Sequence, residues 1–81
     1  MTTILGIKLL GRRAVAMKFQ EILSKYGCNV KTRIGLHEVS GAICSPDGVI
    51  LLEVIGDEKI LSGLIAELKE IDGLKLEIML L

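Results

Sequence analysis

With 81 residues the chain is long enough for one domain and too short to hold a second hydrophobic core. Ten basic residues balance ten acidic ones, so the long-range attraction to phosphate backbones and anionic lipid that marks many nucleic-acid and membrane-surface proteins is missing. Hydrophobic residues make up 51% of the sequence, more than so small a globule hides in one core. This excess predicts self-association into a homodimer or a larger symmetric assembly.

The composition also restricts compartment and partners. The aromatic rings are Phe19 and Tyr26 only, which leaves the strands without a stacking platform for single-stranded nucleic acid. No apolar run reaches the roughly 18 residues that a membrane-spanning helix needs. Two cysteines are too few for the disulfide framework of a small secreted protein, and no signal peptide precedes Ile4. We expect a soluble, cytoplasmic protein with no direct nucleic-acid or membrane partner.

The first half of the chain has the pattern strand, helix, strand. Ile4 to Leu10 is mostly apolar and predicts a strand that Gly11 ends. From Cys28 to Leu36 apolar and polar residues alternate, as in a strand with one covered and one wetter face. Between these strands, residues at helical spacing predict an amphipathic helix that stops at Gly27; they are Val15, Ala16, Phe19, Leu23 and Tyr26.

Turn-forming residues gather between Glu38 and Gly48, where we expect the chain to reverse and join two strands into a hairpin. Within this stretch, Ser45-Pro46-Asp47-Gly48 has the chemistry of a tight turn, because proline pre-sets φ and Asp and Gly tolerate the reversal. Val49 to Ile55 is apolar except for Glu53, which predicts a central strand shielded on much of both faces.

The last quarter of the chain predicts a second helix and a fourth strand. Asp57 suits the N-cap of a helix whose apolar stripe runs from Ile60 to Ile71. Asp72 and Gly73 close this helix. The residues from Leu74 to Leu80 then alternate again as a strand.

The two halves of the chain form an internal repeat with a constant offset of 45 residues. Gly11, Val15, Phe19, Leu23 and Tyr26 correspond to Gly56, Ile60, Leu64, Leu68 and Ile71. Right-handed crossovers for both halves predict a single α+β domain over residues 1–81, with the ferredoxin-like βαββαβ fold. Two helices would cover one face of a four-stranded antiparallel sheet of order 4-1-3-2. On the uncovered face we expect Lys8, Arg33 and Lys75 or Glu77, beside apolar Ile4 and Leu10.

The turn Gly11-Arg12-Arg13 is the candidate ligand-binding site. It joins the first strand to the first helix, where free backbone N–H groups bind anions. Two arginines oppose the helix dipole at this end, a local cost that a carboxylate or phosphate ligand would relieve. The alternative is that Arg12 and Arg13 are two solvated side chains after a tight turn.

Metal binding has weak support in the sequence. Cys28, His37 and Cys44 are the only soft metal ligands, and they form neither a CxxC nor an HxxxH pair. A closed tetrahedral site would need further ligands, for instance from another subunit. A cysteine that packs as a small hydrophobe is far more common, so we predict no metal and no cofactor.

Catalysis has equally weak support. Glu38, Asp47 and Glu53 are carboxylates that acid–base chemistry could use, but nothing in the sequence assembles a pocket around them. The sequence has no P-loop, no dinucleotide-binding glycine pattern and no recognisable Ser/His/Asp arrangement. We therefore expect a protein that is not an enzyme and has no catalytic residue.

Four segments carry a resemblance to a known family: Arg33-Ile34-Gly35-Leu36, Asp47 to Val54, Leu64 to Leu68, and Gly73-Leu74-Lys75-Leu76. Together they resemble the small stand-alone ACT-like regulators of iron-only hydrogenase systems. The resemblance implies an oligomeric regulatory domain of a bacterial cytoplasm, with no catalytic residues to carry over. It also implies a small ligand, often an amino acid, bound between subunits near the turn at Gly11-Arg12-Arg13. An effect on transcription would require a protein partner, because the chain has no basic DNA-binding element.

Other users of the fold fit the sequence less well. A heavy-metal chaperone would carry a Met-x-Cys-x-x-Cys loop after the first strand, where this chain has Leu10-Gly11-Arg12-Arg13. An acylphosphatase would place an arginine at this turn and an asparagine on a neighbouring strand. Asn29 is the candidate asparagine, although it opens the second strand at the far end. An acylphosphatase-like enzyme and a partner-binding module without a small ligand therefore remain as alternatives.

Overall fold

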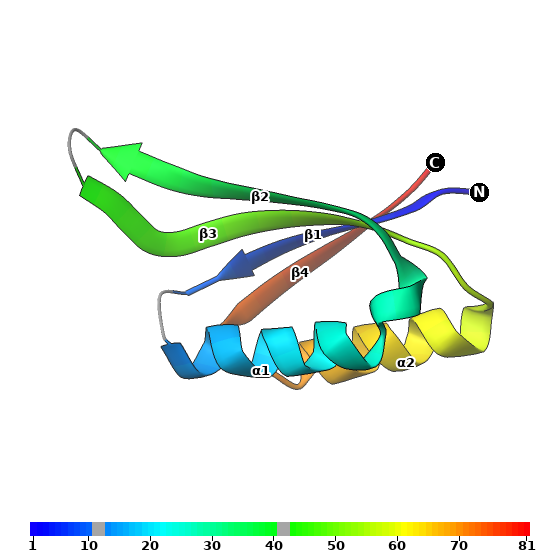
Figure 1. The fold of residues 1–81 in the computed structure, drawn as a ribbon. Coiled ribbons are helices and arrows are strands. Elements are labelled where there is room, and N and C mark those ends of the chain that lie inside the picture. Colours follow the sequence, from blue (N-terminus) through cyan, green and yellow to red (C-terminus); the bar gives the residue numbers. More distant parts are fainter. Residues whose placement is uncertain (11–12, 41–42) are drawn as a thin grey trace.

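The computed structural model describes residues 1–10, 13–40 and 43–81. The four strands form one antiparallel sheet of order β2-β3-β1-β4, and both helices lie on the same face of it (Figure 1). This confirms the predicted ferredoxin-like βαββαβ topology and strand order. In chain order the elements are β1 (Thr3–Leu9), α1 (Arg13–Lys25), the 3₁₀ turn η1 (Gly27–Asn29), β2 (Val30–Ser40), β3 (Ile43–Val54), α2 (Glu58–Lys69) and β4 (Leu74–Leu80).

The hydrophobic core lies between the sheet and the two helices. Alternate residues of the central strands point into it, as the period of a strand requires. Phe19 of α1 is 1% exposed and is the largest fully buried side chain. The other buried members come from β1, β3, both helices and the α2–β4 connection; they are Leu5, Ile7, Val15, Leu23, Ile50, Leu52, Val54, Leu64, Leu68 and Ile71.

The connection between β3 and α2 is built by side-chain contacts. Asp57 Oδ1 accepts a hydrogen bond from the backbone N–H of Ile60 at 2.8 Å, which confirms Asp57 as the N-cap of α2. Asn29 Nδ2 donates to the carbonyl of Ile55 at 2.9 Å, and the Ile55 N–H donates to the Asn29 carbonyl at 2.8 Å. Gly56, which lies between Ile55 and Asp57, has φ +146°, a conformation that L side chains rarely adopt.

The first helix ends at Lys25, just before Gly27, as predicted. Gly27–Asn29 then form a separate 3₁₀ turn that the sequence did not predict. Cys28 lies exposed in this turn, and β2 begins only at Val30. The prediction that Cys28 opens the strand is therefore wrong.

A bulge in β2 changes which side chains face the helices. Val30 pairs with Val54 and Thr32 with Glu53, so Lys31 is an extra residue in the ladder. Val30 packs against the core, whereas Ile34 pairs with Leu51 on the open face. Arg33 points to the helices, where its guanidinium donates to Gln20 Oε1 at 2.8 Å. The expectation that Arg33 lies on the open face is wrong, because the bulge shifts the alternation by one residue.

The β2–β3 hairpin is longer than predicted and projects beyond β1 (Figure 1). Ser40 of β2 pairs with Ile43 of β3, so Ser45-Pro46-Asp47-Gly48 lies within β3 and is not the turn. His37 pairs with Gly48 and Val39 with Cys44, which sets Ser45–Asp47 of β3 opposite one residue of β2. The turn-forming residues make a bulge, one of the few places in a sheet that accept a proline.

Among the residues that the structure describes, no helix is long and apolar enough to cross a membrane.

Candidate functional site

The predicted anion site lies at the start of α1. Arg13 is the first residue of the helix and its side chain is exposed. Gly11 and Arg12 lie outside the described residues. Before them, the Leu10 N–H donates to the Gly73 carbonyl at 2.9 Å, which ties the end of β1 to the α2–β4 connection. The first turn of α1 contains no acidic residue, so Arg13 stands at the positive end of the helix dipole without a carboxylate from that turn.

A shallow depression of about 440 Å³ runs along the outer face of α1 from Arg13. Its other lining residues are Ala16, Met17, Gln20 and Glu21. The arrangement combines a cation, an amide, the carboxylate of Glu21 and an apolar surface, which suits a small ligand that carries both an anionic and a cationic group, such as an amino acid.

Arg33 joins this region from the sheet. Its guanidinium donates to Gln20, which lines the depression, and lies 5.7 Å from the centroid of the Phe19 ring. The cation therefore rests on an aromatic face, a favourable cation–π arrangement. The sequence pattern missed Gln20 and Arg33 as site residues, because regular alternation placed Arg33 on the opposite face of the sheet.

The three soft metal ligands do not come together within one chain. Cys28 lies in η1, and His37 is seven residues further along β2 than Val30, a span of about 23 Å. Cys44 is in β3, where it pairs with Val39. The side chains of His37 and Cys44 lie outside the described part. The described residues contain no cluster of three or more His, Cys, Asp or Glu side chains suited to a metal.

The asparagine of the acylphosphatase alternative is far from the arginine turn. Asn29 follows the C-terminal end of α1, and Arg13 begins that helix of 13 residues, about 20 Å away. The Asn29 side chain is also occupied by its hydrogen bond to Ile55. The structure therefore does not bring this pair together.

The carboxylates considered for acid–base work are not joined in a described pocket. Glu53 lies on the sheet face opposite the helices, where Thr32 Oγ1 donates to Glu53 Oε1 at 3.2 Å. Lys31 Nζ is 3.8 Å from Glu53 Oε2. The side chains of Glu38 and Asp47 lie outside the described part of the chain.

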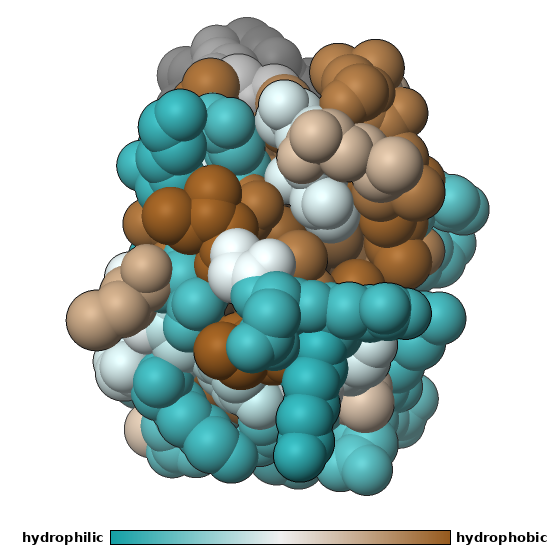
Figure 2. Space-filling model, turned by 90° about the vertical axis from the view of Figure 1, so that its right-hand side faces the viewer, coloured by the Kyte–Doolittle hydropathy of each residue, from teal (hydrophilic) through white to brown (hydrophobic). Residues whose placement is uncertain are grey.

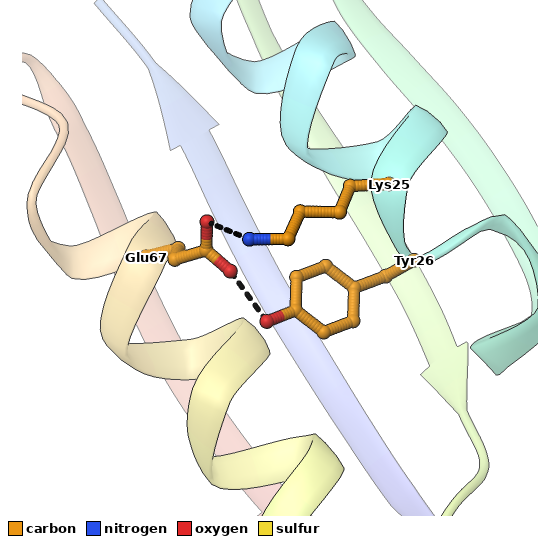
Figure 3. A network of polar contacts seen from close by, with 3 residues as sticks. All are labelled: Lys25, Tyr26 and Glu67. Atoms are coloured by element: carbon orange, nitrogen blue, oxygen red, sulfur yellow. Dashed lines mark hydrogen bonds and ion pairs between the residues drawn. The ribbon is translucent and has the colours of Figure 1, made fainter.

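A polar network joins the two helices at the other end of α1 (Figure 3). Glu67 of α2 accepts hydrogen bonds from the Tyr26 hydroxyl and from Lys25 Nζ, the latter at 2.9 Å. The Tyr26 hydrogen bond, then that of Lys25, holds the pKa of Glu67 below its ordinary value of 4.5. The same carboxylate raises the pKa of Tyr26 and of Lys25. Both carboxylate oxygens are used, so the network serves helix packing.

No family model matches the chain, and no curated protein matches it by sequence. Solved structures do match it. An uncharacterised protein of Thermotoga maritima superposes with a TM-score of 0.83 at 20% identity, over 96% of this chain and 92% of that one. The ACT domain from the GTP pyrophosphokinase of Chlorobium tepidum superposes with a TM-score of 0.67 at 15% identity, over 98% of this chain and 97% of that one.

A third match is a formyltetrahydrofolate deformylase of Pseudomonas putida, with a TM-score of 0.61 at 14% identity. It covers the whole of this chain but only 29% of that protein. These likenesses show the fold. The chain has an ACT-like form of the ferredoxin-like fold, as the sequence resemblance implied, and membership of the hydrogenase-regulator family stays a proposal.

Proposed function

We propose that this chain is a non-catalytic regulatory domain that binds a small anionic or amino-acid ligand and acts as a homo-oligomer. The ACT-like fold supports the proposal, since one solved match is itself the ACT domain of a larger enzyme. The sequence resemblance narrows the class to the regulators of iron-only hydrogenase systems. The observation that carries the ligand site is Arg13 at the start of α1, beside a depression and without an acidic residue in that turn.

The ligand site that we propose is Gly11-Arg12-Arg13, extended along α1 to Gln20. Backbone N–H groups at a helix start bind the oxygens of a carboxylate or phosphate, and an arginine adds a bidentate contact. The apolar surface of Ala16 and Met17 would hold the rest of a small ligand. Arg33 acts through Gln20, whose side-chain oxygen it holds.

Action on transcription would pass through a protein partner. The chain carries no net charge, so it lacks the electrostatic attraction that brings a protein to DNA. Oligomerisation has a different basis, the large share of hydrophobic residues left exposed on the sheet.

A thermal-shift screen of amino acids and phosphorylated metabolites tests ligand sensing. A ligand at ten times its Kd stabilises the folded state by about 1.4 kcal/mol, which raises the Tm of a domain this size by roughly 5–10 °C. Replacing both arginines, Arg12→Ala with Arg13→Ala, should abolish the rise. Lys18→Ala removes an exposed cation of the same helix that does not line the depression, and it should leave the rise unchanged.

If no compound in the screen raises the Tm, ligand sensing is contradicted and a module that binds only protein partners is favoured. An acylphosphate hydrolysis assay tests the catalytic alternative in parallel. Turnover that disappears with Arg12→Ala or Arg13→Ala would overturn the non-catalytic assignment.

A further inference from the structure

The last strand, β4, forms one edge of the sheet, and no described strand covers its outer side. The backbones of Thr2 and Leu81 exchange hydrogen bonds of 2.7 and 2.8 Å, and the Leu10 N–H donates to the Gly73 carbonyl. In an antiparallel ladder the residues that bond to a given neighbour alternate, so the odd-numbered residues of β4 bond to β1. The backbone groups of the even-numbered residues therefore point to the free edge.

The two edges of the sheet differ in regularity. The edge strand β2 has register shifts between Val30 and Thr32 and between His37 and Val39. Such irregularities hinder the pairing of an edge with a further strand. In contrast, β4 pairs with β1 over its whole length without a shift, and it contains neither proline nor glycine. Of the two edges, β4 is therefore the better suited to accept another strand.

Apolar surface lies along the free edge of β4. Ile78 is 43% exposed and Leu80 60%, although both point to the side of the sheet that carries the helices. They line a groove of about 510 Å³ between β4 and α2, together with Leu61 and Ile65. Figure 2 views the end of the molecule where both termini lie, and shows hydrophobic residues gathered in the sheet layer above a mostly hydrophilic helix layer. The helices thus leave this edge incompletely covered.

Two opposite charges lie on the other face of β4. Lys75 and Glu77 are both exposed, and neither belongs to an ion pair among the described residues. The residue opposite Lys75 in β1 is Lys8, a like charge. A carboxylate on the outer side of Lys75 would offset this repulsion.

One antiparallel pairing of β4 with its own copy brings these opposite charges together. A two-fold axis perpendicular to the sheet at Leu76 sets Lys75 opposite Glu77 of the other copy, and Glu77 opposite the other Lys75. The same axis sets Leu74 opposite Ile78 of the other copy, on the helix side. An axis at Lys75 or at Glu77 would set that charge opposite itself, and an axis at Ile78 would leave both charges unpaired.

We infer that β4 pairs antiparallel with β4 of a second copy around the axis at Leu76, so that one sheet spans both copies with all helices on one side. The two Leu76 backbones exchange both of their hydrogen bonds. The Ile78 N–H donates to the Leu74 carbonyl of the other copy, while the Leu74 N–H stays with the Ile71 carbonyl at 3.4 Å. The inference rests on the oligomeric form in the proposed function and is independent of the ligand.

Sedimentation equilibrium without ligand, at micromolar protein, tests this interface. The wild-type chain should be a dimer, and Ile78→Pro should weaken dimerisation by about 30-fold, because each dimer loses two backbone hydrogen bonds. The Ile78 N–H points away from β1, so a proline there keeps the ladder within the chain. By the same alternation the Gly35 N–H of β2 points to the opposite edge of the sheet. Gly35→Pro is therefore the matched control and should remain dimeric.

The results separate this interface from the other parts of the proposal. A wild-type monomer would overturn the inference, and so would dissociation by Gly35→Pro but not by Ile78→Pro. A dimer that Ile78→Pro leaves as tight as wild type would overturn the pairing of β4 and leave the proposed homo-oligomer standing. If no ligand is found but the dimer depends on Ile78, only ligand sensing is contradicted.

Charge reversal tests the register without altering the backbone. Lys75→Glu and Glu77→Lys should each weaken the dimer by roughly tenfold, because two attractive pairs become repulsive in each dimer. The double variant exchanges the two charges and should restore the wild-type Kd. Lys18→Glu, on the exposed side of α1, should leave the Kd unchanged. A double variant no tighter than the weaker single variant would overturn the two-fold register.

Disulfide formation tests the same register by distance. Lys75→Cys and Glu77→Cys are made separately in a chain whose native Cys28 and Cys44 are replaced by serine. Oxidation of an equimolar mixture should give a covalent dimer, because directly opposite residues of a non-hydrogen-bonded pair have Cα atoms about 4.5 Å apart. Either variant alone should stay monomeric on a non-reducing gel, because its cysteines lie on a diagonal of about 7–8 Å. Equal cross-linking of Glu77→Cys alone would overturn the register.

Discussion

The Tyr26 hydroxyl donates a hydrogen bond to the Glu67 carboxylate, and this contact joins the end of α1 to α2. Lys25 binds the other oxygen of the same carboxylate. A single acidic side chain of α2 thus holds the last residue of α1 and the residue that follows it (Figure 3).

Glu67→Gln should lower the Tm at neutral pH, and the effect should depend on pH. The folded-state pKa of Glu67 lies below 4.5 because of Tyr26 and Lys25. A carboxyl with a lowered folded pKa stabilises the fold above its unfolded value and loses this contribution as pH falls through the folded value. The difference in Tm between wild type and Glu67→Gln should therefore shrink below about pH 4.5. Glu70→Gln, an exposed residue of the same region, is the control, and an unchanged difference down to pH 2.5 would contradict the assignment.

The effect of Gly63→Ala on the free energy of unfolding should change sign with the residue at position 26. A Cβ at Gly63 would lie 3.1 Å from Tyr26 Oη, which crowds the hydroxyl, while alanine favours the helix by up to about 1 kcal/mol over glycine. In a Tyr26→Phe background the crowding oxygen is gone, so Gly63→Ala should raise the free energy of unfolding by roughly 0.5–1 kcal/mol. Urea denaturation of the four variants measures this coupling. Equal effects of Gly63→Ala in both backgrounds would show that Tyr26 Oη is not what Gly63 accommodates.

Gly73→Ala should destabilise the fold by about 1–3 kcal/mol. Gly73 has φ +93°, and a Cβ there would lie 3.0 Å from Val15 Cγ2. Gly35→Ala is the matched control, because nothing lies within 4 Å of a Cβ at Gly35. Alanine at that position should be neutral or stabilising by up to about 1 kcal/mol, since it restricts the unfolded chain. Chemical denaturation compares the stability of the two variants. Similar losses of stability in both would show that neither the positive φ of Gly73 nor its contact with Val15 matters.

Asp57→Ala should cost about 1 kcal/mol of stability by removing the N-cap of α2. Asp57→Ser keeps an oxygen that accepts from the Ile60 N–H, so it should retain most of the stability that alanine loses. Thermal denaturation at neutral pH distinguishes the two variants. If alanine and serine behaved alike, the hydrogen bond to Ile60 would carry no stability.

Much of the fold was predictable from local patterns. Val15, Phe19 and Leu23 recur at helical spacing and are all buried, and Leu64 and Leu68 are buried in the second helix as expected. The repeated strand–helix–strand pattern and the right-handed crossover rule then led to the observed strand order. The ACT-like form was predicted from sequence resemblance and is confirmed by the solved structures that match.

The candidate site was predictable only in part. Arg13 does stand exposed at the start of α1, but its neighbours along the helix were not identified. Gln20 looked like an ordinary outer-face residue. Only its contact with Arg33, which comes from a strand, connects it to the region of the site.

The sequence by itself determined the order of the elements, the N-cap at Asp57 and most of the core, because each depends on the spacing of residues that are close in the chain. Only the tertiary structure decided where the hairpin reverses and which face Arg33 and Ile34 occupy. Lys31 is one extra residue in β2, and an extra residue moves every later side chain to the other face of the sheet. Pairing with β3 creates that bulge, so no periodicity within β2 alone could reveal it.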